Sequence, residues 1–321
     1  MKRVPMWWDK PGKKPKGDET KPLPFMKIRW IGFIVTGLIF AVTTVSLATQ
    51  GLNLGLDFTG GVQIEGTQTT PFDVAKVRDE IVKAGFHDSV VTTSNAGKTV
   101  IIRLPVETGA EEVPAISEKV KQVLGSGVSV QVPAVVGPKV SGELFMSGVL
   151  ASILAVAAIG AYVWFRFEVK FGTGAFITTF HDVYAVVGLF SITQMTFDLT
   201  IVAGVLTVAG YSINDTVVVY DRIREMLKKY KKLPITQVID ISITSTLSRT
   251  VMTSLATMMA AGAMAFLGGP VLFGFAISIM FGIIIGTYSS IFVAAPMLIH
   301  LPGRLPGAKY TNPEGAAGAA S

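Results

Sequence analysis

Three ionisable residues, His181, Asp182 and Asp215, lie within long apolar stretches of this sequence, and a fourth, Arg249, opens another. If those stretches cross a membrane, a charge near the bilayer centre costs about 2.5 to 3.5 kcal/mol on insertion scales, so each of these residues needs a function or a partner. A carboxyl group inside a membrane can bind and release a proton, and a histidine titrates near neutral pH. This set of residue types predicts a proton relay.

Asp215 and Arg249 are the two residues best placed to act together. Asp215 precedes Tyr220, near the cytoplasmic end of the expected fourth span, by five residues, which places it inside the membrane at about 1.5 Å per residue. Arg249 opens the expected fifth span, which enters from the same side, so the two side chains should lie at similar depth and could pair. Five polar residues are expected to support a hydrated path along these helices: Tyr211, Asn214, Thr250, Thr253 and Ser254.

His181 and Asp182 lie about halfway along the expected third span and could extend the relay. A structural interpretation remains open for all four residues. Polar groups inside membranes also join helices through hydrogen bonds, and Arg249 could extend its long side chain toward the cytoplasmic headgroups.

Motifs for enzyme chemistry are missing from the sequence. It contains no His-Glu-x-x-His or Gly-x-Ser-x-Gly pattern, so an intramembrane hydrolase has no visible nucleophile and base to support it. It also contains no cysteine, which removes disulfides and Cys-based metal or redox sites. We therefore expect no enzyme activity, no cofactor and no bound metal.

The elements that must position these residues are membrane helices. Half of the 321 residues (50%) are hydrophobic and only 16% are charged, which is far from the composition of soluble proteins. Gly282 and Gly286 have the Gly-x-x-x-Gly spacing that is typical of closely packed membrane helices. Six apolar runs are long enough to span a bilayer: Trp30 to Thr49, Leu144 to Phe165, Gly172 to Ile192, Leu199 to Tyr220, Val251 to Leu267 and Val271 to Ile299.

The distribution of Lys and Arg predicts the orientation of the spans. Basic residues gather in the N-terminal tail, near 166–170, in 222–232 and in the C-terminal tail, whereas the connections 193–198 and 268–270 contain none. The positive-inside rule then places both termini in the cytoplasm. The excess cations flank apolar runs, so the net charge of +6 reflects topology, and no nucleic-acid partner is expected.

The segment between the first two spans is predicted to be a small folded domain outside the cytoplasm. Strand-like alternation at Val62 to Thr67, a helix at Pro71 to Ala84, a hairpin over 90–104, a second helix and a final strand at Val128 to Val136 follow one another. This βαββαβ order favours a ferredoxin-like sandwich. The expected divisions are a basic tail (1–29), the first span (30–50), the periplasmic domain (51–143), five further spans (144–300) and a C-terminal tail (301–321).

Several segments together resemble the SecF family of the Sec protein-export machinery. The matching segments are 136–144, His181-Asp182, 209–225 (AGYSINDTVVVYDRIRE) and 248–254. A further match follows the first span, where the motif ends in Asp57, Phe58, Thr59, Gly60 and Gly61. The likeness extends from the first span through the sixth.

This resemblance implies a fold and a role. The fold would be a membrane α-helical bundle of six helices, half of an RND-type transporter, with a small α+β ferredoxin-like periplasmic domain, in the bacterial inner membrane. The partners would be SecD, the SecYEG channel, in many bacteria YajC, the lipid bilayer and the translocating unfolded polypeptide. The role would be to use the proton-motive force in late steps of export, with Asp215 and Arg249 on the proton path.

Two other roles remain open. The chain could be a structural subunit that stabilises SecD and the channel without moving protons. An RND-like exporter of small molecules is less favoured, because the outer domain is single and small.

Overall fold

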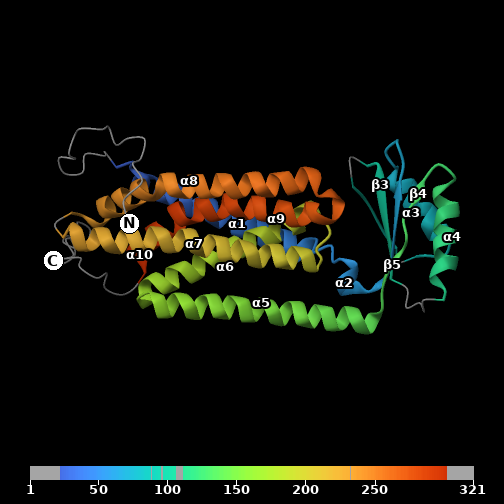
Figure 1. Cartoon of the computed structure of the whole chain (residues 1–321), viewed down its shortest axis with the longest axis horizontal. Coiled ribbons are helices and arrows are strands. Elements are labelled where there is room, and N and C mark those ends of the chain that lie inside the picture. Colours follow the sequence, from blue (N-terminus) through green and yellow to red (C-terminus); the bar gives the residue numbers. More distant parts are fainter. Residues whose placement is uncertain (1–21, 88, 95–96, 106–110, 232, 302–321) are drawn as a thin grey trace.

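The computed structural model describes residues 22–87, 89–94, 97–105, 111–231 and 233–301. Most of the two basic tails expected from the sequence therefore lies outside the described residues. The molecule has two parts, a long helical bundle and a small α+β domain at one end of it (Figure 1). Both termini of the described chain lie at the opposite end of the bundle.

In the part of the chain that the structure describes, the bundle contains six helices that are long and apolar enough to cross a membrane, which confirms the fold class predicted from the sequence. Several extend beyond the apolar runs, because hydropathy marks only the part of a helix that lies in lipid. The helices are α1 (Arg29–Thr49), α5 (Pro138–Arg166), α6 (Val169–Thr193), α7 (Leu199–Lys229), α8 (Ile235–Leu267) and a last one formed by α9 (Gly269–Ser289), η2 (Ser290–Ala294) and α10 (Ala295–His300).

Three of the six spans form the centre of the bundle. In α6, α7 and the last span, 56, 50 and 61% of the most apolar window is buried, against 17, 6 and 17% in α1, α5 and α8. Glycines let the central helices approach closely: a Cβ atom on Gly282 of α9 would lie 2.2 Å from Val208 Cγ2 of α7. The outer helices thus expose apolar side chains to lipid or to a partner.

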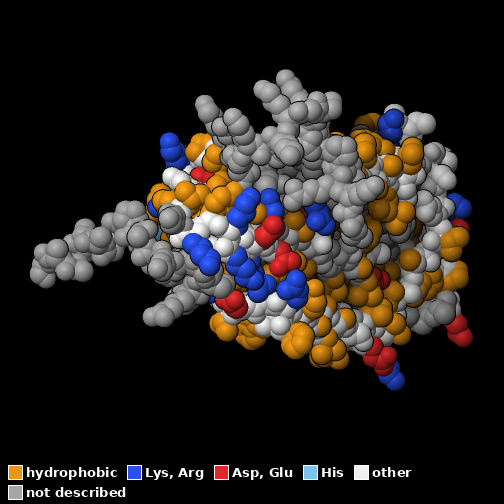
Figure 2. Space-filling model, turned by 60° about the vertical axis from the view of Figure 1, so that its left-hand side comes forward, with side chains coloured by type: hydrophobic (Ala, Val, Ile, Leu, Met, Phe, Trp, Pro, Cys, Tyr) orange, Lys and Arg blue, Asp and Glu red, His pale blue; other side chains and the backbone are white. Residues whose placement is uncertain are grey.

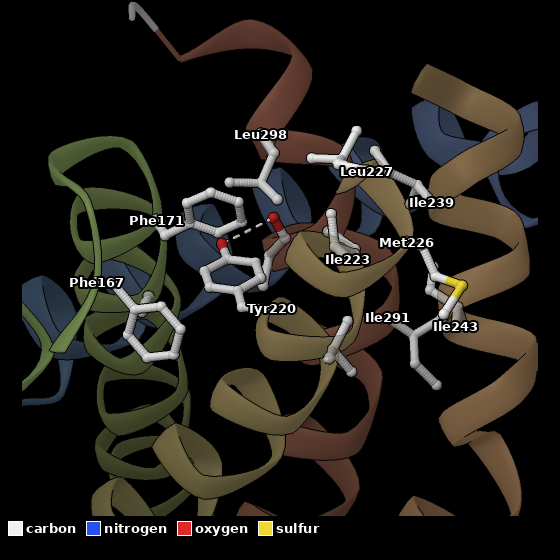
Figure 3. Close-up of a cluster of buried hydrophobic side chains, with 14 of the residues drawn as sticks. Phe167, Phe171, Tyr220, Ile223, Met226, Leu227, Ile239, Ile243, Ile291 and Leu298 are labelled. Carbon is white, nitrogen blue, oxygen red and sulfur yellow. Dashed lines mark hydrogen bonds between the residues drawn. The ribbon is translucent and has the colours of Figure 1, made fainter. Parts of the chain in front are cut away.

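The end of the bundle farthest from the outer domain has its own core. Tyr220 on α7 is fully buried, packs against Phe167 and Phe171, and donates a hydrogen bond of 2.9 Å to the carbonyl oxygen of Ala294 (Figure 3). The short helix η1 (Phe25–Ile28) joins this core through Met26. Charged side chains of both signs gather at this end, and apolar side chains cover much of the flank beside them (Figure 2).

The outer domain contains an antiparallel sheet in the strand order β2-β3-β1-β4, as in a ferredoxin-like sandwich. Helices α3 (Val74–Lys83) and α4 (Val113–Leu124) pack on the sheet through Val77, Ile81 and Val120. Its strands are β1 (Gly61–Thr67), β2 (Val90–Ser94), β3 (Thr99–Leu104), β4 (Ser129–Val130) and β5 (Ala134–Val136).

The final strand differs from the sequence prediction. One strand was expected from Val128 to Val136, but it is divided into β4 and β5, which both pair with β1. Pro133 lies at the break and has no N–H to donate to a strand ladder. A further element, the single turn α2 (Leu56–Thr59), joins α1 to the sheet.

Candidate functional site

Asp182 on α6 is the centre of a buried polar cluster that joins three helices. Its Oδ1 accepts a hydrogen bond of 2.8 Å from Nδ1 of the neighbouring His181. Its Oδ2 accepts from Ser289 Oγ at 2.7 Å and also from Ser212 Oγ, so α6, α7 and the end of α9 meet at one carboxyl group. The Asp182 side chain is completely buried, so it needs these three donors in place of the water that would otherwise hydrate it.

His181 has one ring nitrogen engaged and one free. An ionised Asp182 can only accept hydrogen bonds, so the hydrogen of a neutral imidazole lies on Nδ1 and Nε2 carries a lone pair. His181 Nε2 is buried and has no hydrogen-bond partner among the residues that the structure describes. Asp182 therefore orients the ring, and Nε2 is the atom that could take up a proton.

Asp215 has a different environment from Asp182. Its residue is only 3% exposed, yet its Oδ2 atom has no hydrogen-bond partner within the described chain. Asp215 lies three residues after Ser212 on α7, so it is about 4.5 Å further along the axis than the residue that contacts Asp182. The structure thus brings Asp215 one turn away from the Asp182 cluster and leaves part of its carboxyl group unpaired.

Arg249 and Asp215 lie at similar depth, as the sequence predicts. Asp215 lies 16 residues from the outer end of α7 at Leu199, or about 24 Å along the helix axis. Arg249 lies 18 residues from the outer end of α8 at Leu267, or about 27 Å along its axis. The two described side chains form no ion pair, because Arg249 is exposed on the outside of α8 whereas Asp215 is buried. The charge of Arg249 still acts on Asp215 electrostatically.

The five supporting polar residues divide into an inner and an outer group. Tyr211 donates a hydrogen bond of 3.0 Å to Ser254 Oγ, which lies 2.7 Å from Thr287 Oγ1, so this chain joins α7, α8 and α9. Thr250 is buried between helices. Asn214 on α7 is exposed, and so are Thr253 and Arg249, which lie one turn apart on the same face of α8. The expected single path is therefore a buried network, and Asn214 and Thr253 lie outside it.

Sequence reasoning missed three residues of these networks: Ser212, Ser289 and Thr287. Each is a small hydroxyl residue within an apolar helix. Nothing in the local pattern distinguishes a serine that bonds its own helix from one that reaches a neighbouring carboxyl group. Their roles depend on which helices are adjacent, and that is visible only in the fold.

The motif after the first span lies at the junction between the two parts of the molecule. Asp57 Oδ2 accepts a hydrogen bond of 3.1 Å from the backbone N–H of Leu199 and thereby caps the first turn of α7. Phe58 packs against Phe145 of α5 and Phe197, with ring centroids 5.8 and 6.4 Å apart. Thr59 Oγ1 bonds the Gly55 carbonyl within its own turn.

Gly60 and Gly61 end this motif for steric reasons. Both have positive φ angles, +68° and +105°, which favour glycine. A Cβ atom on Gly61 would lie 2.2 Å from the carbonyl oxygen of Leu104 on β3, closer than any real contact. The pair therefore lets the chain turn directly from α2 into the sheet.

Comparisons with known proteins agree with the motifs. A family model described as "Protein export membrane protein SecD/SecF, C-terminal" matches residues 116–304, and one for the SecD/SecF GG motif matches residues 45–65. The chain is 42% identical over 282 residues to the protein translocase subunit SecF of Pseudomonas aeruginosa, an overlap of 86% of this chain and 90% of that protein. The chain belongs to the SecF family of protein translocase subunits.

Other SecF proteins are similarly close. The SecF subunit of Desulfurispirillum indicum is 40% identical over 286 residues, which are 87% of this chain and 91% of that protein. Within the matched range 45–65, Gly60 and Gly61 are the adjacent glycines, so the GG motif of SecF is the tight turn described above.

Solved structures of SecDF share this fold. The crystal structure of SecDF from Thermus thermophilus, described as a translocon-associated membrane protein, matches with a TM-score of 0.80 and 34% identity over 92% of this chain. SecDF in a super-membrane-facing form matches with a TM-score of 0.63 and 30% identity over 99% of the chain. The SecF-family chain covers only 39 and 41% of those two chains, so each contains a large region with no counterpart here.

Proposed function

We propose that this SecF-family chain works with SecD to convert the proton-motive force into late steps of protein translocation. The observation that carries the proposal is the buried Asp215 carboxyl group, whose Oδ2 atom lacks a hydrogen-bond partner within the described chain. A permanently structural carboxyl group is normally paired, as Asp182 is, because an unpaired buried polar atom is costly. Asp215 is thus suited to gain and lose a proton.

The charge of Asp215 then changes how it interacts with Arg249. When Asp215 is ionised, the nearby positive charge on α8 attracts it, and when Asp215 is protonated this attraction disappears. Each state can favour a different arrangement of α7 against its neighbours, which is the differential interaction that a conformational change requires. His181, held by Asp182, provides a second buried site for a proton one turn away.

The energy available is adequate for this mechanism. One charge that crosses a potential of 100 mV releases about 2.3 kcal/mol. A two-state equilibrium shifts by about tenfold for every 1.4 kcal/mol, so one proton can bias the conformation without fixing it. Directed work further requires that Asp215 be accessible from the two sides of the membrane in turn.

Exposed polar side chains at this depth, Asn214 on α7 and Arg249 and Thr253 on α8, support a membrane partner. Without a partner, the charge of Arg249 and the amide of Asn214 would face lipid at the depth of Asp215. Charges inside a bilayer have a high free-energy cost. SecD is the partner that we propose for these side chains, since the solved SecDF chains contain a further region larger than this chain. SecYEG, YajC and the translocating unfolded polypeptide are the proposed wider partners.

The proposed location is the bacterial inner membrane. Both termini would lie in the cytoplasm and residues 51–143 in the periplasm. The positive-inside rule supports this orientation, because the basic residues of 222–231 and the two ends of the described chain lie at the end of the bundle opposite the outer domain.

A purely structural role is the second candidate, and the Asp182 cluster favours it. That cluster joins three helices through hydrogen bonds to both carboxyl oxygens of Asp182, as a scaffold would. The two functions differ in what they require of Asp215, because a scaffold needs its shape and a relay needs its titration.

Export of a secretory precursor into inverted membrane vesicles distinguishes these functions. Vesicles carry SecD with the wild-type chain, with Asp215→Asn or with Glu225→Gln, each at matched levels and with or without a proton gradient. Glu225 is a matched control, because it lies on the same helix with a side chain that is 59% exposed. We expect Asp215→Asn alone to lose the gradient-dependent part of export. Unchanged gradient-dependent export in Asp215→Asn would establish the structural role instead.

A further inference from the structure

We propose that Arg103 is a positioning residue that holds the outer domain on the connection between α6 and α7, so that a movement of α7 is passed to the outer domain. The inference rests on the proposed function, because it names the link between the proton site and the outer domain. Arg103 belongs to no motif that the sequence analysis singled out, and its contacts leave its own domain.

The guanidinium group of Arg103 bonds to the segment that joins α1 to the outer domain and to the connection between α6 and α7. Its Nη1 atom donates to the carbonyl oxygen of Leu54 at 2.5 Å, and its Nη2 atom donates to Asn53 Oδ1 at 3.0 Å. Nη2 also donates to Thr196 Oγ1, in the α6–α7 connection, at 3.2 Å. One side chain on β3 therefore fixes the chain that leaves α1 and the chain that enters α7.

The segment after α1 and the α6–α7 connection also pair with each other. The N–H of Gly55 donates to the carbonyl oxygen of Phe197 at 2.7 Å, and the N–H of Phe197 donates to the carbonyl oxygen of Asn53 at 2.8 Å. Two residues further on, Asp57 accepts from Leu199, the first residue of α7. The outer domain is thus attached to the start of α7 itself.

Arginine is the suitable residue for this position. Its planar fork can donate to three acceptors in fixed directions, which a lysine ammonium group on a flexible stem cannot reproduce. Burial lowers the pKa of the Arg103 guanidinium, and the negative charge of Asp198 acts in the opposite direction. Because an arginine side chain is not deprotonated in proteins, the group stays charged and its hydrogen bonds are charge-assisted.

The path from Arg103 to the proton site is short. Leu199 and Asp215 lie on one uninterrupted helix, so a shift or rotation of α7 at Asp215 reaches its outer end about 24 Å away. At that end, Asp57 and the Phe197 backbone meet the helix start, and Arg103 holds the same connection to the sheet. The outer domain then moves with α7.

Spin labels can test whether Arg103 holds the domain. The chain has no cysteine, so two introduced cysteines label specifically: Lys119→Cys, exposed on α4, and Thr193→Cys, exposed at the outer end of α6. Their distance distribution is measured by double electron–electron resonance in the full chain with a cysteine-free SecD. The variants are Arg103→Ala and Thr196→Val, and the control is Arg78→Ala, an exposed arginine on α3 of the same domain.

We expect a narrow distribution in the wild type and in Arg78→Ala, and broader ones in Arg103→Ala and Thr196→Val. Thr196→Val removes one hydroxyl in a loop, so it remains informative if Arg103→Ala fails to fold. Gradient-dependent export should fall several-fold in the variants with broadened distributions, while gradient-independent export is retained. Distributions that do not change overturn the positioning role.

A broadened distribution with full gradient-dependent export overturns the transmission of movement. The proposed function is tested separately by Asp215→Asn in the same labelled background, which should abolish gradient-dependent export while the distance distribution stays narrow. If Asp215→Asn exports normally, the proton relay fails, and the distance measurement still decides whether Arg103 holds the domain.

Discussion

Ser289 at the end of α9 donates a hydrogen bond of 2.7 Å to Oδ2 of Asp182 on α6. Ser290, the next residue, is also buried, and among the described residues its hydroxyl bonds only the Thr287 carbonyl oxygen one turn earlier in the same span. These neighbouring serines have equal size and burial, and they differ in whether they reach the buried carboxyl group. They therefore provide a matched pair for measuring what the Asp182 cluster contributes.

We predict that Ser289→Ala lowers the free energy of unfolding by about 1 to 3 kcal/mol, because it leaves a buried acceptor with one donor fewer. Ser290→Ala should change it by less, since no charged group loses a partner. Thermal unfolding of the purified chain in detergent measures both. Equal losses from the two variants would show that the cluster adds nothing to stability.

The turn at Gly60-Gly61 predicts a steric effect that can be separated from backbone strain. Gly61 and Gly85 both have φ near +100°, so an alanine at either position is strained by about 1 to 2 kcal/mol. At Gly61 the new Cβ would also meet the Leu104 carbonyl oxygen, whereas nothing lies within 4 Å of Gly85. We expect Gly61→Ala to lower the free energy of unfolding by a further 1 to 3 kcal/mol, roughly the cost of overpacking a core.

Limited proteolysis of the outer domain, together with thermal unfolding, measures this difference. Gly61→Ala should expose the domain to cleavage at a lower temperature than Gly85→Ala. If both variants resist protease equally, the close approach to Leu104 is not what requires glycine in the motif.

Close packing of α9 on α7 predicts opposite results for two helix glycines. Gly282→Ala would place a Cβ atom 2.2 Å from Val208 Cγ2, whereas Gly262 on α8 has nothing within 4 Å. We expect Gly282→Ala to destabilise the bundle by about 1 to 3 kcal/mol through overpacking. Gly262→Ala should be neutral or stabilising, because alanine is the better helix former by about 1 kcal/mol. Melting temperatures in detergent that fall equally for both would contradict this packing.

Much of the architecture follows from the sequence because hydropathy and period are local. The six apolar runs and the alternating strands of the outer domain predict the fold class, which the structure confirms. The same local signals end where a helix leaves the lipid, so α8 begins at Ile235 and not near Val251. Pro133 could have indicated the break between β4 and β5, since proline rarely lies within a strand.

The candidate site could be predicted only in part. Charges in apolar runs identify Asp215, Arg249, His181 and Asp182, and helix rise gives the depth of the first two. The direction in which each side chain points depends on how the helices pack, so the lack of an ion pair between Asp215 and Arg249 could not be foreseen. Arg103 was missed for a similar reason, because its acceptors lie about 50 and 90 residues away in the chain.

The central claim is that Asp215 exchanges protons, and proton flux tests it most directly. The chain is reconstituted with SecD in liposomes that contain a pH-sensitive dye, and a membrane voltage is imposed. We predict that wild type and Glu225→Gln change the internal pH and that Asp215→Asn, although it assembles with SecD, does not. Flux through Asp215→Asn at the wild-type rate would contradict the account.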